Sequence, residues 1–272
     1  MMTTADMVLD ERVTVTFDGA VAEVRLERAD KHNALDARMF AAITAAADFV
    51  AERSDVRAVV LSGAGPSFCA GLDLRSFVPK IASGAFSNLE DRDRGDMNLF
   101  QHVSMAWRDL APPVIAALHG SVFGGGLQIA LGADVRISTP DAKLSIMETR
   151  WGLVPDMGGM VLLRSLVRAD VLRELVYSAR VLSGAEAQAV GLVTQVHADP
   201  RAEALRMAHA IAAQSPRAIK AAKRLLNAMN DQDRAGLLML ESTEQLALLG
   251  GPDLIEAMTA NVQGRDPVYS EP

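Results

Sequence analysis

The chain has 272 residues, half of them hydrophobic, and its 27 basic and 34 acidic residues give a formal net charge of −7. A chain of this length and apolar content can bury a large core, which excludes a disordered or fibrous protein. The acidic balance, without any long basic run, argues against a nucleic-acid or membrane-surface partner.

The first part of the chain predicts β structure followed by a helix. Residues 13–17 and 22–26 alternate between apolar and polar with a period of two around Asp18-Gly19, which is a strong hairpin signal. Over residues 36–50 the apolar positions take a helical spacing instead. The chain therefore begins with a predicted hairpin and a helix.

The next segments repeat this alternation of strand and helix. Residues 58–61 form a short apolar run of the kind found in a parallel strand that is covered on both faces. A helical stripe over 99–110 and a second apolar run over 114–118 follow. After a glycine run, 127–132 has the pattern of a buried helix and 135–138 that of a strand. The repeated βα pattern predicts an α/β fold.

Helical signals dominate the rest of the chain. Ser183 and Glu186 have the spacing of a capping box, which satisfies free backbone amides at the start of a helix. Beyond residue 199 the sequence is rich in Ala and Leu and helical in period. We therefore predict an α/β domain over residues 1–199 and a helical region over 200–272. The helical region is apolar for so small a unit, so we expect part of it to contact another subunit.

Cysteine usage and the N-terminal sequence restrict the class of protein further. The single cysteine, Cys69, excludes an intrachain disulfide framework and a cysteine-cluster zinc site. Residues 1–11 contain acids and no apolar core, so they do not resemble a signal peptide, and no run of about 18 apolar residues occurs. We expect a cytoplasmic protein, and the sequence indicates neither a metal nor a redox cofactor.

Two glycine-containing turns, residues 67–74 and 119–126, each follow a predicted strand. Glycine permits backbone conformations that leave amide groups pointing outward, and an amide at a helix N-terminus also gains the helix dipole. Two such turns side by side would hold one oxyanion, which is a powerful catalytic device. Tight turns where helices pack close to a sheet would explain the same glycines, so the spacing alone leaves both interpretations open.

Several strings of residues resemble the crotonase (enoyl-CoA hydratase/isomerase) superfamily in their order and spacing, over about residues 10–265. They are 33–35, 67–74, 113–120, 124–127, 133–136, Glu148, 152–155 and 158–159. The resemblance implies a ββα-spiral core and a C-terminal helical trimerisation region, assembled as a homotrimer or a dimer of trimers. It also implies an acyl thioester of coenzyme A as the substrate. Coenzyme A is then part of the substrate, and no separate cofactor is implied.

The resemblance implies a role for several residues by their position. The backbone amides of Leu72 and Gly125 would form an oxyanion hole that stabilises an enolate of the thioester, so that a carboxylate can remove a nearby proton. The positions of the coenzyme A pocket hold Asn33, Ala34, Ala70, Gly71, Asp73 and Gly124. The cations near its phosphates would be Arg28, Lys31 and Arg75. A helix N-cap for Asp73, and solvated surface positions for the cations, are the alternatives.

The acidic residues decide which reaction the resemblance implies. Hydration of a 2-enoyl thioester uses two carboxylates, and the position of the first holds Gln128, whose amide orients water but transfers no proton. Glu148 holds the second position. Asp156 stands where typical hydratases have glycine, and its arrangement with Glu148 resembles that of dienoyl-CoA isomerases, which however have Asp at the position of Gln128. Turn capping, or a salt bridge with Arg150 or a partner subunit, is the alternative role for Asp156.

We therefore predict an enzyme that isomerises a double bond of an enoyl- or dienoyl-CoA, with these catalytic residues: Glu148, Asp156, Leu72, Gly125 and Gln128. The alternatives are 2-enoyl-CoA hydration and a non-catalytic acyl-CoA-binding protein, which Gln128 would explain. Decarboxylation, thioester hydrolysis and ring closure use the same enolate-stabilising frame and also stay open. The insert at residues 76–97 is expected to cover the acyl chain and to set its length.

Overall fold

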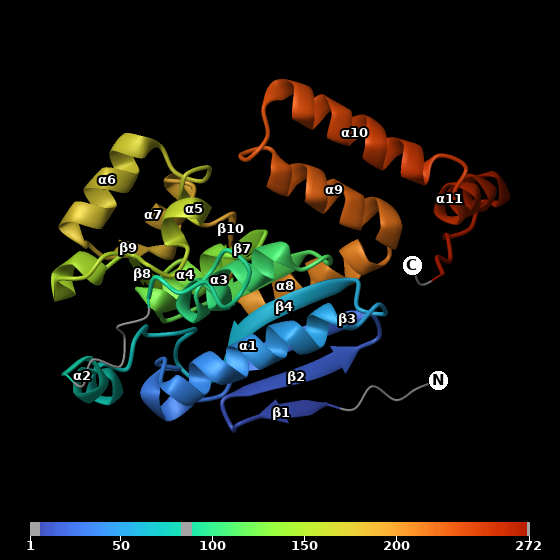
Figure 1. Ribbon diagram of the computed structural model, residues 1–272. Helices are drawn as coiled ribbons and strands as arrows, with labels where there is room; N and C mark the ends of the chain where they lie inside the picture. The colour runs from blue at the N-terminus through green and yellow to red at the C-terminus, as the bar shows by residue number, and fades with distance from the viewer. Residues whose placement is uncertain (1–5, 83–88, 271–272) are drawn as a thin grey trace.

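The computed structural model describes residues 6–82 and 89–270, and Figure 1 shows their arrangement. The central feature is a seven-stranded sheet in the order β1-β2-β3-β4-β5-β7-β10. Its strands are β1 (Met7–Leu9), β2 (Val13–Asp18), β3 (Val21–Leu26), β4 (Ala58–Gly63), β5 (Val114–Leu118), β7 (Val135–Ser138) and β10 (Gln195–Val196). The first three strands pair antiparallel, and the pairs from β3 to β10 are parallel.

A second sheet has three strands in the order β6-β8-β9, namely β6 (Ser121–Phe123), β8 (Lys143–Ser145) and β9 (Leu182–Ser183). The chain passes from β5 to β6 through Gly120, whose φ is +58°. A Cβ at this position would lie 1.9 Å from the carbonyl oxygen of Pro66, so a side chain cannot be accommodated. Gly120 thus begins the second glycine turn, residues 119–126, by taking the chain out of the main sheet and into β6.

Helices cover both faces of the main sheet. Val59 and Leu61 of β4 face one side and join a large apolar cluster with three helices, α1 (Ala37–Ala51), α3 (Leu99–Asp109) and α4 (Gly125–Leu131). Val60 and Ile115 belong to a second cluster, where they pack with one helix, α8 (Pro200–Ala212). The prediction of parallel strands that are covered on both faces is therefore confirmed.

Several of these elements begin at residues that the sequence already marks as helix caps or turns. The carboxylate of Asp36 accepts a hydrogen bond from the Met39 amide at 2.8 Å and caps the first turn of α1. Ser183 and Glu186 form the predicted capping box at the start of α7 (Gly184–Ala189). The predicted hairpin is present as β2 and β3. These elements follow from short-range hydrogen bonding and apolar periodicity.

The other helices are α2 (Leu74–Ala82), α5 (Gly159–Leu163), α6 (Ala169–Ser178), α9 (Pro216–Ala228), α10 (Arg234–Leu248) and α11 (Pro252–Gln263), with the 3₁₀ helices η1 (Ala29–Lys31) and η2 (Glu148–Trp151). Beyond residue 199 the described chain is helical, as predicted. The domain boundary itself stays a prediction, because α8, the first helix after it, packs on the main sheet. In the described ranges no helix is both long and apolar enough to cross a membrane.

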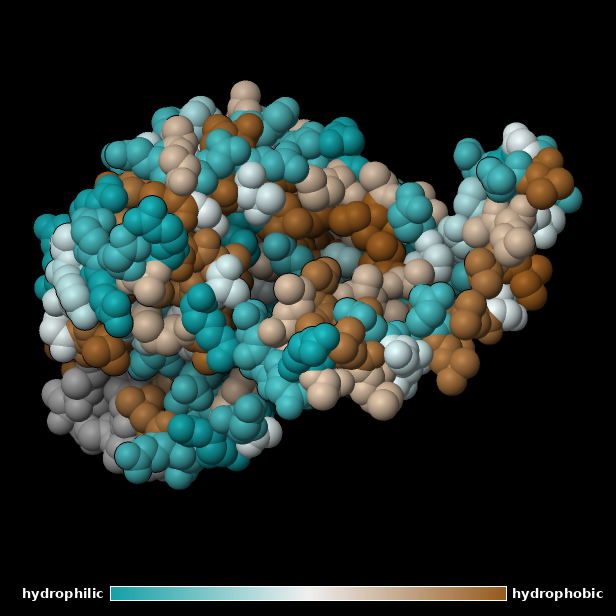
Figure 2. Space-filling model, turned by 90° about the horizontal axis from the view of Figure 1, so that it is seen from above, coloured by the Kyte–Doolittle hydropathy of each residue, from teal (hydrophilic) through white to brown (hydrophobic). Residues whose placement is uncertain are grey.

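Helices α9 to α11 project from one side of the molecule (Figure 1). α10 buries none of its residues. Large apolar side chains on these helices are exposed, among them Leu226, Met239, Leu246, Met258 and Val262. Figure 2 shows hydrophobic residues along this projecting part. The projecting helices therefore leave an apolar surface without a partner in the single chain.

Candidate active site

The two glycine turns lie against each other. The Phe123 amide donates to the carbonyl oxygen of Cys69 at 3.0 Å, which joins β6 to the first turn. Gly71 has a φ of +86°, and a Cβ there would lie 2.6 Å from the Phe123 oxygen and 3.7 Å from the Gly125 nitrogen. Only glycine allows the two turns to approach so closely. The structure thus brings the first turn to the N-terminus of α4.

The amides of Leu72 and Gly125 both border one cavity. Gly125 is the first residue of α4, so its N–H has no partner within the helix. The backbone groups on either side of Leu72 are used, since Gly71 accepts from Leu35 at 2.8 Å and Asp73 donates to Leu35 at 2.9 Å. Neither the Leu72 nor the Gly125 amide donates a hydrogen bond to any residue that the structure describes. Both are available to a ligand oxygen.

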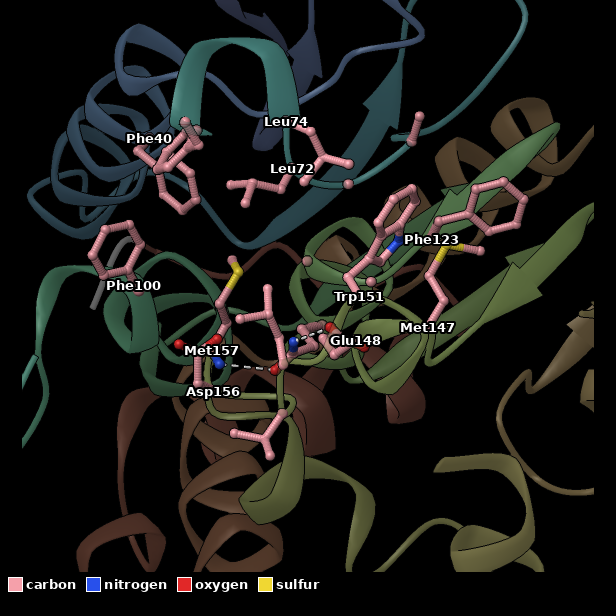
Figure 3. Close-up of a pocket in the computed structure, with 18 of the residues that line it drawn as sticks. Phe40, Leu72, Leu74, Phe100, Phe123, Met147, Glu148, Trp151, Asp156 and Met157 are labelled. Carbon is pink, nitrogen blue, oxygen red and sulfur yellow. Dashed lines mark hydrogen bonds between the residues drawn. The ribbon is translucent and has the colours of Figure 1, made fainter. Parts of the chain in front are cut away.

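The cavity has a volume of about 620 Å³, and its wall is mostly apolar. The lining includes Leu72, Leu74, Phe123, Met147 and Met157, which Figure 3 labels. Gln128, Glu148 and Asp156 line the same space. The five residues predicted as catalytic are therefore brought to one cavity from α4, η2 and two loops.

Glu148 begins η2 and is buried, with 8% of its surface exposed. Its Oε1 accepts a hydrogen bond from Gln128 Nε2 at 2.5 Å, whereas its Oε2 is buried without a partner among the described residues. A Cβ on Gly124 would lie 3.4 Å from Oε1, so the glycine run lets the carboxylate lie close to the backbone of α4. Glu148 thus presents one uncommitted carboxylate oxygen beside the start of that helix.

Burial raises the pKa of Glu148 above its ordinary value, and the negative charge of Asp156 raises it further. The hydrogen bond from Gln128 opposes this shift, because the amide donates to the charged carboxylate. A carboxylate with a raised pKa is a stronger base once it is ionised. The site therefore contains a group suited to remove and return a proton.

Gln128, on α4, is 3% exposed, and its side chain is held from both ends. Its Oε1 accepts hydrogen bonds from the Met157 amide at 2.9 Å and the Gly159 amide at 3.0 Å, while Nε2 donates to Glu148. Two backbone donors fix the carbonyl end of the amide, so the NH₂ end must face Glu148. Gln128 thus links the proposed base to the turn that carries Asp156 (Figure 3).

Asp156 borders the cavity while keeping access to solvent. The surrounding protein still removes enough water to raise the pKa of its carboxyl group through partial burial. Within the described ranges Asp156 forms no salt bridge with Arg150 or with any other cation. The site therefore holds two carboxyl groups whose pKa values are both raised.

The residues predicted for the coenzyme A pocket divide into two groups. Ala70, Gly71 and Gly124 line the cavity, whereas the side chains of Arg28, Lys31, Asn33, Ala34 and Asp73 do not. Asn33 is fully buried, and its Nδ2 donates to three carbonyl oxygens, those of Ala64, Ser67 and Phe68. Asn33 therefore holds the loop after β4 in place.

Arg28 and Asp73 form a salt bridge of 2.8 Å beside the cavity. Arg28 Nη1 also donates to the Ala34 oxygen at 2.9 Å, so this guanidinium is engaged within the protein. Asp73 Oδ1 accepts from the Ser76 amide at 3.4 Å, the geometry of the N-cap that was the alternative for this residue. Lys31 and Arg75 are exposed near the loop. Neither forms a salt bridge with a residue that the structure describes, and their role beside a phosphate stays a prediction.

Cys69, next to the first turn, provides no nucleophile. The thiol is fully buried and donates to the Asn33 carbonyl oxygen at 3.1 Å. Burial raises the pKa of Cys69 to about 12, so the thiol is protonated at neutral pH. No group of three or more His, Cys, Asp or Glu in the described part of the chain could hold a metal ion.

The sequence analysis missed the aromatic residues that close one end of the cavity, namely Phe40, Phe77 and Phe100. They come from α1, α2 and α3. No short-range pattern joins them, because 37 and 23 positions separate them along the chain (77 − 40 and 100 − 77). Only their place on three consecutive helices around the cavity could have identified them.

Comparisons with known proteins match nearly the whole chain. A family model described as enoyl-CoA hydratase/isomerase matches residues 16–272. The chain is 34% identical to a Bacillus subtilis protein named as an enoyl-CoA hydratase/isomerase, YngF, across 92% of this chain and 94% of that protein. It is 31% identical to the peroxisomal Delta(3,5)-Delta(2,4)-dienoyl-CoA isomerase of Arabidopsis thaliana, across 96% of both. It is 30% identical to the mitochondrial methylglutaconyl-CoA hydratase of Mus musculus, across 90% of this chain and 77% of that protein.

Solved structures agree with the sequence comparisons. A structure described as an enoyl-CoA hydratase from Streptomyces coelicolor A3(2) superposes with a TM-score of 0.90 at 30% identity, covering 100% of this chain and 98% of that one. An enoyl-CoA hydratase from Bacillus anthracis gives a TM-score of 0.88 at 26% identity, covering 96% and 100%. The α/β fold expected from the resemblance, with its C-terminal helices, is confirmed.

Proposed function

Because the chain belongs to the enoyl-CoA hydratase/isomerase family, we propose that it isomerises a carbon–carbon double bond in an enoyl- or dienoyl-CoA thioester. One observation carries the proposal. Among the described residues, Oε2 of Glu148 has no hydrogen-bond partner, and the two amides of Leu72 and Gly125, which line the same cavity, have no acceptor. Gln128 stands where a second acid would be needed to hydrate the substrate.

The first step binds the thioester carbonyl. Its oxygen accepts hydrogen bonds from the amides of Leu72 and Gly125, and the second of these also contributes the positive end of the α4 dipole. Negative charge grows on this oxygen as the enolate forms, so donors fixed in advance stabilise the transition state more than the substrate. Removal of one such donor costs about 3–4 kcal/mol in a studied enzyme.

Glu148 then moves the proton. Its carboxylate removes a proton from C2, and the C–H electrons pass into the enolate. With a 3-enoyl thioester the same proton returns to C4. With a 3,5-dienoyl thioester Glu148 keeps that proton, protonated Asp156 donates another proton to C6, and proton exchange with solvent restores both carboxyl groups; in each case the double bonds shift toward the carbonyl group. Atoms and charge balance without a cofactor. For the longer shift Asp156 supplies the second proton-transfer group, and its raised pKa favours that role.

Gln128 favours isomerisation over hydration. Addition of water needs one group to take a proton from the water and another to give a proton to carbon. An amide does neither at neutral pH, and both ends of this amide already bond to the protein. The similarity to the Arabidopsis dienoyl-CoA isomerase supports this choice, and the similarity to the mouse hydratase keeps hydration as the second candidate.

The purified protein should be incubated separately with 2-enoyl-, 3-enoyl- and 3,5-dienoyl-CoA while absorbance is followed. We expect conversion of the 3-enoyl or the 3,5-dienoyl thioester and little loss of the 2-enoyl chromophore. Rapid addition of water to the 2-enoyl thioester would contradict the proposal. Inertness toward all three, with binding retained, would favour a non-catalytic acyl-CoA-binding protein.

Two substitutions assign the roles of the two acidic residues in the reaction. Glu148→Gln should lower kcat for isomerisation at least about 100-fold, because it removes the proposed base. Asp156→Asn should lower the rate for the 3,5-dienoyl substrate by a similar factor and leave the 3-enoyl rate within about threefold. Equal, small effects of Asp156→Asn on both substrates would reduce Asp156 to a structural role.

A further inference from the structure

One end of the cavity is closed by aromatic rings. Phe40 packs edge-on against Phe77 and Phe100, with ring centroids 5.8 Å and 5.1 Å apart. Phe40 and Phe77 are 2% and 4% exposed. Figure 3 shows Phe40 and Phe100 together at one side of the cavity. The three rings at this end offer no hydrogen-bonding group, and two of them are buried.

The opposite end of the cavity is open. Trp151 is 56% exposed and lies beside Phe123 and Met147 in Figure 3. The coenzyme A part of a thioester is large and carries phosphates, so it must remain near solvent. A thioester held at the two free amides therefore directs the far end of its acyl group toward the aromatic end.

The charged groups around the cavity disfavour an acyl group that ends in a negative charge at the aromatic end. Among the residues whose side chains the structure describes, the ionisable groups that line the cavity are Glu148 and Asp156, and neither is a cation. A carboxylate at the tip of the acyl group would lose its water without gaining a partner. It would also share the cavity with two other carboxyl groups. Both effects disfavour a charged acyl tip.

We propose that the substrate of this site is a thioester whose acyl group is uncharged and apolar to its tip, and that the cavity rejects acyl groups ending in a carboxylate. This inference rests on the proposed function, because it needs the thioester to be held at Leu72 and Gly125. It defines the substrate class, which the family does not fix for this chain.

The direct test compares binding of two saturated acyl-CoA thioesters of equal chain length by titration calorimetry, one ending in a methyl group and one in a carboxylate. Neither can isomerise, so the affinity is measured without turnover. We expect the carboxylate to bind at least about 100-fold more weakly, since a buried, unpaired charge is costly. The methyl ester of the charged thioester, as a control for polarity and length, should recover most of the affinity. Affinities of the charged and uncharged thioesters within about threefold would overturn the inference.

A pair of variants tests whether the lack of a cation in the cavity causes the weaker binding of the charged thioester. Leu89 lines the cavity and is 39% exposed, whereas Val78 on α2 is 59% exposed and is not part of the cavity wall. Leu89→Arg should improve binding of the charged thioester at least about tenfold, because it supplies the missing cation. Val78→Arg adds the same charge outside the cavity and should not. Equal improvement in both variants would show a general attraction and overturn the inference.

Turnover of the matching unsaturated thioesters separates this inference from the proposed function. If the uncharged thioester binds preferentially but its 3-enoyl and dienoyl forms do not react, the isomerase proposal fails and the inference stands. If both classes bind and isomerise equally well, the inference alone fails. If no acyl-CoA thioester binds, both are wrong.

Discussion

A single buried amide, that of Gln128, opposes the effect of burial on the pKa of its neighbour Glu148. The amide can donate to Glu148 only through its NH₂ group, because two backbone donors occupy its oxygen. This bond favours the ionised form of Glu148, whereas burial and Asp156 favour the protonated form. The net effect raises the pKa of Glu148, so at a pH above that pKa the folded protein bears the cost of a buried negative charge.

We therefore expect Glu148→Gln to lose activity and to gain stability at about pH 7. The pKa of Glu148 is raised above its ordinary value of 4.5, so the folded protein binds this proton more tightly than the unfolded chain does. The destabilisation is present above the folded pKa and disappears as the pH falls below the unfolded value. Urea unfolding at about pH 7 and about pH 4 should show a stability gain that narrows at the lower pH.

The matched control is Glu52→Gln, which neutralises an exposed acid after the end of α1. This change should alter stability by no more than about 0.5 kcal/mol at either pH. A loss of stability in Glu148→Gln at neutral pH would contradict the expectation, because it would mean that the carboxylate stabilises the fold.

At the scale of secondary-structure elements, the turns between them position the backbone groups that are proposed to act in the reaction. Leu72 and Gly125 line one cavity because β6 and the loop after β4 are joined by backbone hydrogen bonds and contact each other at Gly71. In the proposed mechanism the N–H of Leu72 binds the thioester oxygen, and its side chain takes no part. A change in backbone path is therefore expected to cost more than a change of that side chain.

Gly71→Ala tests this dependence. Its Cβ would lie 2.6 Å from a backbone oxygen, and its φ is +86°, so the turn must shift and the Leu72 amide with it. We expect kcat to fall about 10²–10³-fold, the range for loss of one oxyanion donor. Gly19→Ala is the control, because Gly19 also has positive φ but no atom within 4 Å of its Cβ.

The Gly19→Ala control should lower the free energy of unfolding by about 1–2 kcal/mol, because alanine is strained in the left-handed backbone conformation. It should leave kcat unchanged. Steady-state kinetics and urea unfolding of both variants separate the two effects. If Gly71→Ala is destabilised as expected but retains full kcat, the Leu72 amide has no role in the reaction.

Elements that are specified by residues close together in the sequence could be predicted, whereas surfaces built from distant parts of the chain could not. The hairpin of β2 and β3 and the capping box at Ser183 follow from neighbouring residues. The glycine turns and Glu148 were identified because a resemblance fixed their order. The rings of Phe40, Phe77 and Phe100 meet only after three helices pack. The engagement of Arg28 by Asp73 likewise needs a contact across 45 positions (73 − 28), which no periodicity reports.

For the molecule as a whole, polar contacts join the C-terminal helices to the body of the protein, while large apolar side chains on them remain exposed. Lys223 of α9 is 4% exposed, and its Nζ lies 2.8 Å from Asp134 Oδ2 and bonds to the Trp107 and Pro112 oxygens. This ion pair, with its lysine buried, ties α9 to the body of the protein. The apolar surface of α9 to α11 then faces outward, which favours association with further copies of the chain.

We expect a trimer, or a pair of trimers, whose mass is three or six times the 29.0 kDa of one chain. Leu246 of α10 is 73% exposed, so Leu246→Glu should leave the folded chain intact and shift the assembly to lower mass. Gln245→Glu adds the same charge at a polar position and should shift it less. Light scattering after size exclusion measures both, and a monomeric unmodified protein would refute the prediction.

The chain contains two tryptophans, and their surroundings differ sharply. Trp107 is 1% exposed in the apolar core, whereas Trp151 is 56% exposed at the open end of the cavity. We therefore expect the indole of Trp107 to give a steady emission background, and that of Trp151 to lose water, and so change its emission, when a thioester binds at the proposed site. The molecule carries its own fluorescent reporter of occupancy, and titrations need no attached dye.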